Sequence, residues 1–155
     1  MSSKNKSTPT HAERAANYRE EWFSCSQSVF AAYAPDFGIS ADTGLKIATP
    51  FGAGMGKQQY TCGAVTGALM VLGLKFGMGE NDPAENKSLT YSKTLEFMEE
   101  FKRINGSISC LELLDGLNMN DPADYQQMLD QKMFINRCNK YVDDAVKILN
   151  KILEN

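Results

Sequence analysis

The sequence predicts an all-α protein, a single-domain helical bundle. No segment of the 155-residue chain sustains the alternation of apolar and polar residues that marks a half-buried strand. Apolar residues instead recur at steps of three and four, and helix-capping residues stand at the starts of several such stretches. A glycine-rich apolar segment at about residues 62–77 has Lys75 as its only charge. Such a segment predicts a helix covered on all sides, at the centre of the bundle.

The first predicted helix spans about residues 12–34. Its inward stripe includes Trp22, Cys25 and Val29, which recur at helical spacing. A turn containing proline ends this helix, and a second, short helix is predicted over residues 40–48.

A glycine-rich loop containing Gly54 and Gly56 follows. Its G-x-G-x-G spacing departs from the dinucleotide-binding fingerprint, and no strand-like segment precedes it. We interpret it as a tight, closely packed turn, with anion binding as the less favoured alternative.

The start of the central helix combines a cap, a thiol and two glycines. Thr61 is predicted as the N-cap, which leaves Cys62 in the first turn, where unpaired N–H groups favour a thiolate. Gly63 and Gly67 share one helix face, where another helix could approach backbone to backbone.

A longer helix is predicted over about residues 82–104. Asp82 is its expected N-cap and Pro83 its first residue. Its predicted inward residues are Leu89, Leu95, Met98 and Phe101.

Two more helices complete the chain. Ser109 and Glu112 have capping-box spacing, which places Cys110 at the first position of a short helix. A last helical stretch is predicted over residues 121–153, with Asp121 as its N-cap, Pro122 as its first residue and a break near Met133. Its inward set is Phe134, Cys138, Tyr141, Ala145, Ile148 and Ile152.

Composition and charge limit the partners and the compartment. The net charge of −3 disfavours nucleic acid and anionic membranes as partners. The central apolar run falls short of the roughly 20 residues that span a bilayer. No apolar signal segment follows Met1, so we expect a cytoplasmic protein. We also expect a disordered leader at residues 1–10 and one domain at residues 11–155.

Four cysteines carry the functional signal. They are Cys25, Cys62, Cys110 and Cys138. Their convergence would create a tetrathiolate site for an iron–sulfur cluster or zinc, or two dithiols that cycle as disulfides. The alternative is inert core thiols, which spacing alone favours because the chain has no Cys-x-x-Cys. If the thiols are functional, Cys62 is predicted to react fastest and Cys110 next.

The order and surroundings of these cysteines extend beyond a short motif. Cys25 is followed by the glycine-rich loop and Cys62-Gly-Ala-x-x-Gly67, then by Cys110-Leu-Glu-Leu-Leu and finally by Cys138. This pattern resembles the C_GCAxxG_C_C family, described as putative redox-active proteins. The central motif differs from the family label by one place, because glycine follows the cysteine here. The resemblance implies a redox role for the four cysteines.

We therefore expect a redox or electron-transfer protein with one four-cysteine site and an unidentified redox partner. An iron–sulfur cluster is preferred over a dithiol pair, with zinc or no cofactor as alternatives. The supporting loop and helix-start residues would be Gly54, Gly56, Thr61, Gly63, Gly67 and Ser109.

The rival hypothesis belongs to another class. It is a non-enzymatic helical interaction module with structural zinc or inert cysteines, in which the glycine face serves packing or a homodimer. Hydrolase chemistry has no support, because the single histidine, His11, is interpreted as a solvated residue near a helix start.

Overall fold

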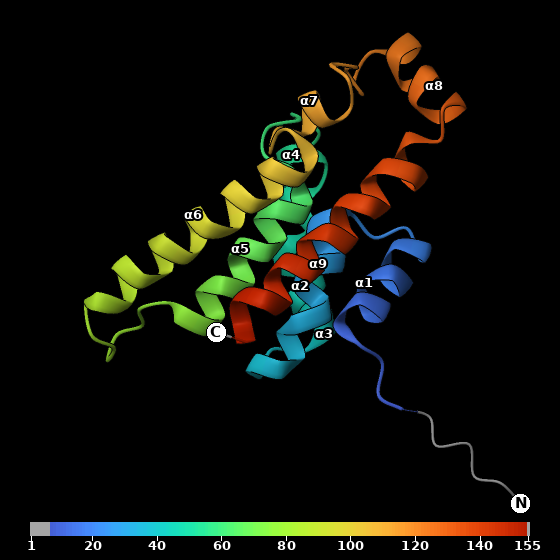
Figure 1. The fold of residues 1–155 in the computed structure, drawn as a ribbon. Coiled ribbons are helices and arrows are strands. Elements are labelled where there is room, and N and C mark those ends of the chain that lie inside the picture. Colours follow the sequence, from blue (N-terminus) through green and yellow to red (C-terminus); the bar gives the residue numbers. More distant parts are fainter. Residues whose placement is uncertain (1–6, 155) are drawn as a thin grey trace, which may run out of the picture.

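A computed structural model describes residues 7–154, and within that range the chain forms helices and no strand (Figure 1). The predicted all-α class is confirmed. The α-helices are α1 His11–Glu20, α2 Cys25–Tyr33, α3 Ala41–Ala48, α4 Gly52–Met55, α5 Gly63–Phe76, α6 Glu85–Asn105, α7 Cys110–Leu113, α8 Pro122–Asp130 and α9 Asn139–Glu154. Short 3-10 helices at Ala34–Phe37 and Thr49–Phe51 and a π-helix at Phe134–Cys138 connect some of them. No helix in the described range is long and apolar enough to cross a membrane.

Helix α5 is the central helix, as predicted. It contacts α2, α6 and α9, and Figure 1 shows it running through the middle of the bundle. Val65, Val71 and Leu72 on α5 are completely buried. Gly73 and Lys75 are exposed, so the expectation of cover on all sides is wrong for the second half of α5. A lysine and a glycine leave little apolar surface there to bury.

The glycine face of α5 packs against the start of α2. A Cβ atom at Gly63 would lie 2.9 Å from the backbone nitrogen of Ser26, and one at Gly67 would lie 2.8 Å from its carbonyl oxygen. Side chains at these two positions would therefore force the helices apart. The predicted backbone-to-backbone approach is confirmed, and it brings the first residues of α2 and α5 together.

The predicted helix over residues 12–34 is wrong, because it is broken between Glu20 and Cys25. Trp22 adopts a φ of 68° and is 84% exposed, so it does not belong to an inward stripe. Ser24 restarts the helix through a capping box. Its hydroxyl accepts the Gln27 N–H, and the Gln27 side chain accepts the Ser24 N–H. The capping box thus supplies partners for N–H groups that, in a continuous helix, would bond to carbonyls four residues earlier.

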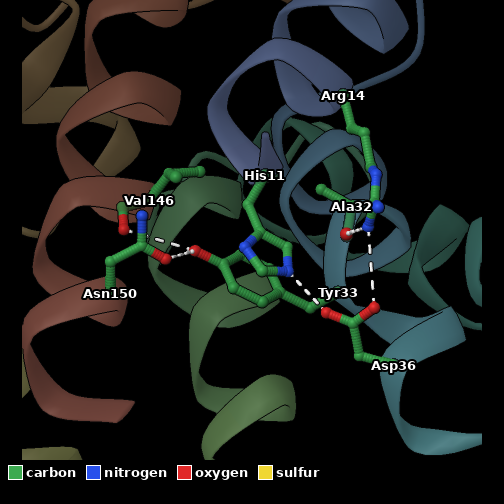
Figure 2. A network of polar contacts seen from close by, with 7 residues as sticks. All are labelled: His11, Arg14, Ala32, Tyr33, Asp36, Val146 and Asn150. Atoms are coloured by element: carbon green, nitrogen blue, oxygen red, sulfur yellow. Dashed lines mark hydrogen bonds and ion pairs between the residues drawn. The ribbon is translucent and has the colours of Figure 1, made fainter. Parts of the chain in front are cut away.

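Helix α1 is fastened to the bundle by the polar network in Figure 2. The His11 ring stacks on Tyr33 with centroids 4.0 Å apart, and its Nε2 atom pairs with Asp36. Arg14 also pairs with Asp36, at 3.6 Å, and the Tyr33 hydroxyl donates to Asn150 on α9 at 2.6 Å. His11 is thus a half-buried packing residue, and its interpretation as a solvated residue is wrong. Residues 1–6 of the predicted leader lie outside the described residues.

Helix α6 begins later than predicted. Asp82 accepts a hydrogen bond from the backbone of the preceding turn and does not cap the helix, which starts at Glu85. Phe101 is completely buried and Met98 packs against the core, as predicted, but Leu89 and Leu95 are exposed, contrary to prediction. Phe97, which was not in the predicted set, is completely buried. The inward stripe is therefore rotated relative to the predicted one.

The C-terminal helices follow the predicted capping signals. Asp121 caps α8 and Pro122 is its first residue. The break expected near Met133 is present, because α8 ends at Asp130 and the π-helix follows. The predicted inward residues of α9 are buried: Tyr141, Ala145, Ile148 and Ile152.

Candidate thiol site

All four cysteines line one cavity of about 120 Å³. It lies where α2, α5 and α7 begin and where the π-helix ends. The cysteines are all free thiols in the part of the chain that the structure describes. The other residues that line the cavity are Arg19, Ser24, Ala53, Gly63, Leu113, Leu114, Met119, Phe134 and Tyr141. Helices separated by more than a hundred residues thus contribute thiols to one space.

Cys62 and Cys110 are brought together by two antiparallel loops. The Cys62 N–H donates to the Ile108 carbonyl at 2.8 Å, and the Cys110 N–H donates to the Tyr60 carbonyl at 2.6 Å. In such a pairing, residues 62 and 110 are diagonal neighbours on the same face. Both thiols therefore point to the same side of the paired loops.

The predicted cap at Thr61 is wrong. Thr61 lies opposite Ser109 in an isolated β-bridge, and Cys62 is itself the N-cap of α5, with φ −51° and ψ 134°. Cys62 therefore precedes the first turn and does not lie within it. Ser109 caps α7 as predicted, because its hydroxyl accepts the Glu112 N–H, and Cys110 is the first residue of α7.

The glycine-rich loop forms a tight turn, as predicted, and it supports the pairing of the segments before Cys62 and around Cys110. Gly54 and Gly56 have φ values of 66° and 58°, and a Cβ at Gly54 would lie 2.5 Å from the Cα of Gln59. The buried Gln59 side chain donates to the Leu117 carbonyl and accepts the Met119 N–H, both at 2.8 Å. The loop thus holds the segment before Cys62 against the segment after Cys110.

Cys25 is the first residue of α2, so its predicted position in the middle of a helix is wrong. The capping box at Ser24 places it there, next to the close contact between α2 and α5. A Cβ at Gly63 would lie 3.2 Å from the Cβ of Cys25. The glycine therefore allows Cys25 to lie beside the start of α5.

Cys138 is the last residue of the π-helix Phe134–Cys138 and is half-buried. Insertions of this kind are rare and occur frequently at functional sites. The π-helix continues directly into α9, where the predicted inward stripe resumes.

Cys25 and Cys138 differ sharply in acidity. A hydrogen bond with the Cys138 thiol and the charge of Arg19 lower the pKa of Cys25 to about 7, although burial opposes this shift. The same hydrogen bond, with burial, raises the pKa of Cys138. The pair therefore consists of a thiolate-forming sulfur and a neutral donor beside it.

Cys62 and Cys110 favour the neutral form. Burial raises the pKa of Cys110 to about 12 and also raises the pKa of Cys62. These directions contradict the predicted order of reactivity, in which Cys62 comes first. The prediction considered only helix starts, whereas burial raises the pKa of Cys62 and Cys110 and the neighbouring Cys138 thiol lowers that of Cys25.

Arg19 is a site residue that the sequence pattern did not indicate. Its guanidinium donates to the carbonyls of Phe23 and Phe134 at 3.0 Å and to the Asn139 side chain at 2.8 Å. It therefore ties the turn before Cys25 to the π-helix that ends at Cys138. Most of its partners are remote in the sequence. The only sequence signal for Arg19 is its position in the last turn of α1.

The described residues contain no preformed metal site. Among the residues described, no group of three or more histidine, cysteine, aspartate or glutamate side chains is placed to hold a metal ion. The iron–sulfur cluster and zinc stay predictions.

Comparison with known proteins agrees with the cysteine pattern. The model of a family described as "Putative redox-active protein (C_GCAxxG_C_C)" matches residues 23–152, which include all four cysteines. No curated protein and no solved structure matches the chain.

Proposed function

The chain belongs to the C_GCAxxG_C_C family, and we propose that it is a redox protein in which Cys25 and Cys138 cycle between a dithiol and a disulfide. The observation that carries the proposal is that both thiols line one small cavity, Cys25 at the start of α2 and Cys138 at the end of the π-helix. Two sulfurs that share a cavity of about 120 Å³ need little movement of α2 or the π-helix to form a bond.

The acidity of the pair suits this chemistry. A thiol attacks best when its pKa lies near the ambient pH, and the pKa of Cys25 is about 7. Cys138 stays protonated beside it and loses its proton when the S–S bond forms. Closing the disulfide releases two electrons to an oxidant, and an external dithiol protein would return them. In a reducing cytoplasm, the location that we propose, the resting pair would be the dithiol.

Cys62 and Cys110 take a different role in this proposal. Diagonal neighbours in paired strands have Cα atoms about 7–8 Å apart, whereas a disulfide needs roughly 4.4–6.8 Å. These two thiols therefore stay reduced and form the neutral wall of the cavity. They also serve as matched controls, because each is a cysteine in the same cavity.

The test is disulfide mapping after mild oxidation with diamide. Mass analysis of unreduced peptides should find a bond between Cys25 and Cys138. The bond should be lost in Cys25→Ser and Cys138→Ser and kept in Cys62→Ser and Cys110→Ser. A bond that joins other cysteines, or none at all, would contradict the proposal. Stoichiometric iron and acid-labile sulfide after oxygen-free purification would instead support the cluster.

A further inference from the structure

The size and walls of the thiol cavity restrict what can reach Cys25. An apolar cavity of about 150 Å³ accommodates benzene, so this one, at about 120 Å³, holds a smaller molecule or only the reactive end of a molecule of that size. Leu113, Leu114, Met119 and Phe134 form apolar parts of the wall. A small, neutral molecule with an apolar group fits this space, whereas a charged peptide does not.

Arg19 supplies the charge in this cavity. It is the only lysine or arginine that lines the cavity, and no carboxylate in the described range forms an ion pair with it. Three of its five N–H groups donate to protein acceptors, and the other two have no acceptor among the described residues. An unpaired guanidinium next to a sulfur nucleophile stabilises negative charge that develops on a leaving atom.

We propose that the oxidant for this site is a small organic hydroperoxide, which deepens the dithiol cycle proposed above and rests on it. The molecule is neutral and small, and its reduction develops negative charge on an oxygen. An apolar cavity lined by the unpaired guanidinium of Arg19 favours a molecule with these properties.

The first step oxidises Cys25. Its thiolate attacks the terminal oxygen of the hydroperoxide, so an S–O bond forms and the O–O bond breaks. The alkoxide leaves beside Arg19 and takes a proton from solvent to become the alcohol. Cys25 is then a sulfenic acid, and the hydroperoxide has been reduced by two electrons.

The second step closes the disulfide. The sulfur of Cys138 attacks the sulfenic sulfur of Cys25, and the hydroxyl leaves with the Cys138 proton as water. Two thiols and one hydroperoxide thereby yield one disulfide, one alcohol and one water. Arg19 also positions this pair, because it holds the carbonyls of Phe23 and Phe134. An external dithiol restores both thiols by exchange.

The test compares oxidants on the reduced protein. The loss of the free Cys25 thiol is measured over time. Samples are quenched with iodoacetamide, and the alkylated Cys25 peptide is quantified by mass. With tert-butyl hydroperoxide, the second-order rate should exceed that of free cysteine by about 100-fold at the same pH. In Cys138→Ser, dimedone should label Cys25, because the sulfenic acid has lost the thiol that resolves it.

The variant Arg19→Gln tests the assigned cation. Its rate with tert-butyl hydroperoxide should fall by about 100-fold, and the loss should persist at a pH where Cys25 is fully ionised. Arg19→Lys should recover part of the rate because it keeps the charge. Arg14→Gln is the matched control, since Arg14 lies on the same helix but pairs with Asp36 and Ala32. It should leave the rate unchanged.

The outcomes separate the two proposals. If tert-butyl hydroperoxide reacts no faster than with free cysteine while diamide still forms the disulfide, the hydroperoxide assignment is overturned and the dithiol cycle stands. A faster reaction with glutathione disulfide than with the hydroperoxide overturns the assignment as well. If diamide also fails to join Cys25 and Cys138, the dithiol cycle itself is wrong.

Discussion

The acidity of Cys25 depends chiefly on one neighbouring thiol, and removing that thiol is the most direct perturbation of the site. Cys138 lowers the pKa of Cys25 through a hydrogen bond, which is the largest contribution, ahead of the charge of Arg19. Cys138→Ala deletes the donor, whereas Cys138→Ser keeps a hydroxyl donor at the same position. The two variants therefore differ mainly in whether Cys25 receives a hydrogen bond.

The expected magnitude follows from the shift. The pKa of Cys25 falls from 9.0 to about 7, so about half of the thiol is ionised at pH 7 instead of about 1%. Complete loss of the shift would therefore reduce the thiolate fraction at pH 7 by roughly 50-fold. In Cys138→Ala, burial still raises the pKa of Cys25 and the charge of Arg19 still lowers it, so we expect the shift to be lost and the full reduction to be seen. Cys138→Ser should lie between this variant and the parent protein.

The assay is the pH dependence of iodoacetamide alkylation, quantified at Cys25 by peptide mass. The parent profile should have its midpoint near pH 7, and the midpoint in Cys138→Ala should move toward 9. Alkylation of Cys62 and Cys110 in the same samples is the internal control, and both should react slowly at pH 7. An unchanged midpoint in Cys138→Ala would refute the assignment of the hydrogen bond. Faster alkylation of Cys62 than of Cys25 would refute the order of acidity.

Three further predictions concern helix packing, capping and pH. Gly67→Ala should lower the free energy of unfolding by about 1–3 kcal/mol, because its Cβ meets the Ser26 backbone at 2.8 Å. Gly73→Ala, whose Cβ meets no described atom within 4 Å, should raise the free energy of unfolding by about 0.5–1 kcal/mol. Urea titrations measure both variants, and equal changes in Gly67→Ala and Gly73→Ala would contradict the packing argument. Ser24→Ala should lower the free energy of unfolding by about 1 kcal/mol and raise the pH midpoint of Cys25 alkylation. An unchanged midpoint would show that the cap does not affect the thiol. Because the pKa of Cys25 is depressed in the folded protein, its contribution to stability is complete above about pH 9 and is lost as pH falls through about 7. The difference in unfolding free energy between parent and Cys25→Ser should therefore grow from pH 6 to pH 9, and a constant difference would contradict the shift.

Local signals in the sequence predicted most helices correctly. The predicted caps at Ser109 and Asp121 are confirmed, because each hydroxyl or carboxylate accepts an N–H three residues ahead. The lack of charge predicts the central helix, and the spacing of its glycines predicts the close approach of another helix, which the structure identifies as α2. These features involve residues within a few positions of one another, so spacing suffices to identify them.

Errors arose where the structure follows a bonding pattern other than the predicted one. The spacing through Trp22 indicates one continuous helix, but the capping box that Ser24 forms in the structure determines where α2 begins. Thr61 likewise has the side chain of an N-cap, but its backbone pairs with the loop at Ser109. A partner nearly fifty residues away thus displaced the helix start by one position. Pairing between remote segments leaves no trace in local spacing.

The sequence alone determined the all-α class, the central glycine-faced helix, and the presence of four cysteines in a family-like order. Only the tertiary structure decided that these cysteines line one cavity and which of them is acidic. Both outcomes depend on contacts between remote residues, such as Arg19 with Phe134 and Cys62 with Ile108. The pKa of a thiol is set by the charges, donors and burial around it in space. Cys25 is therefore acidic because of where Cys138 and Arg19 lie in the folded chain, and its neighbours in sequence do not encode that arrangement.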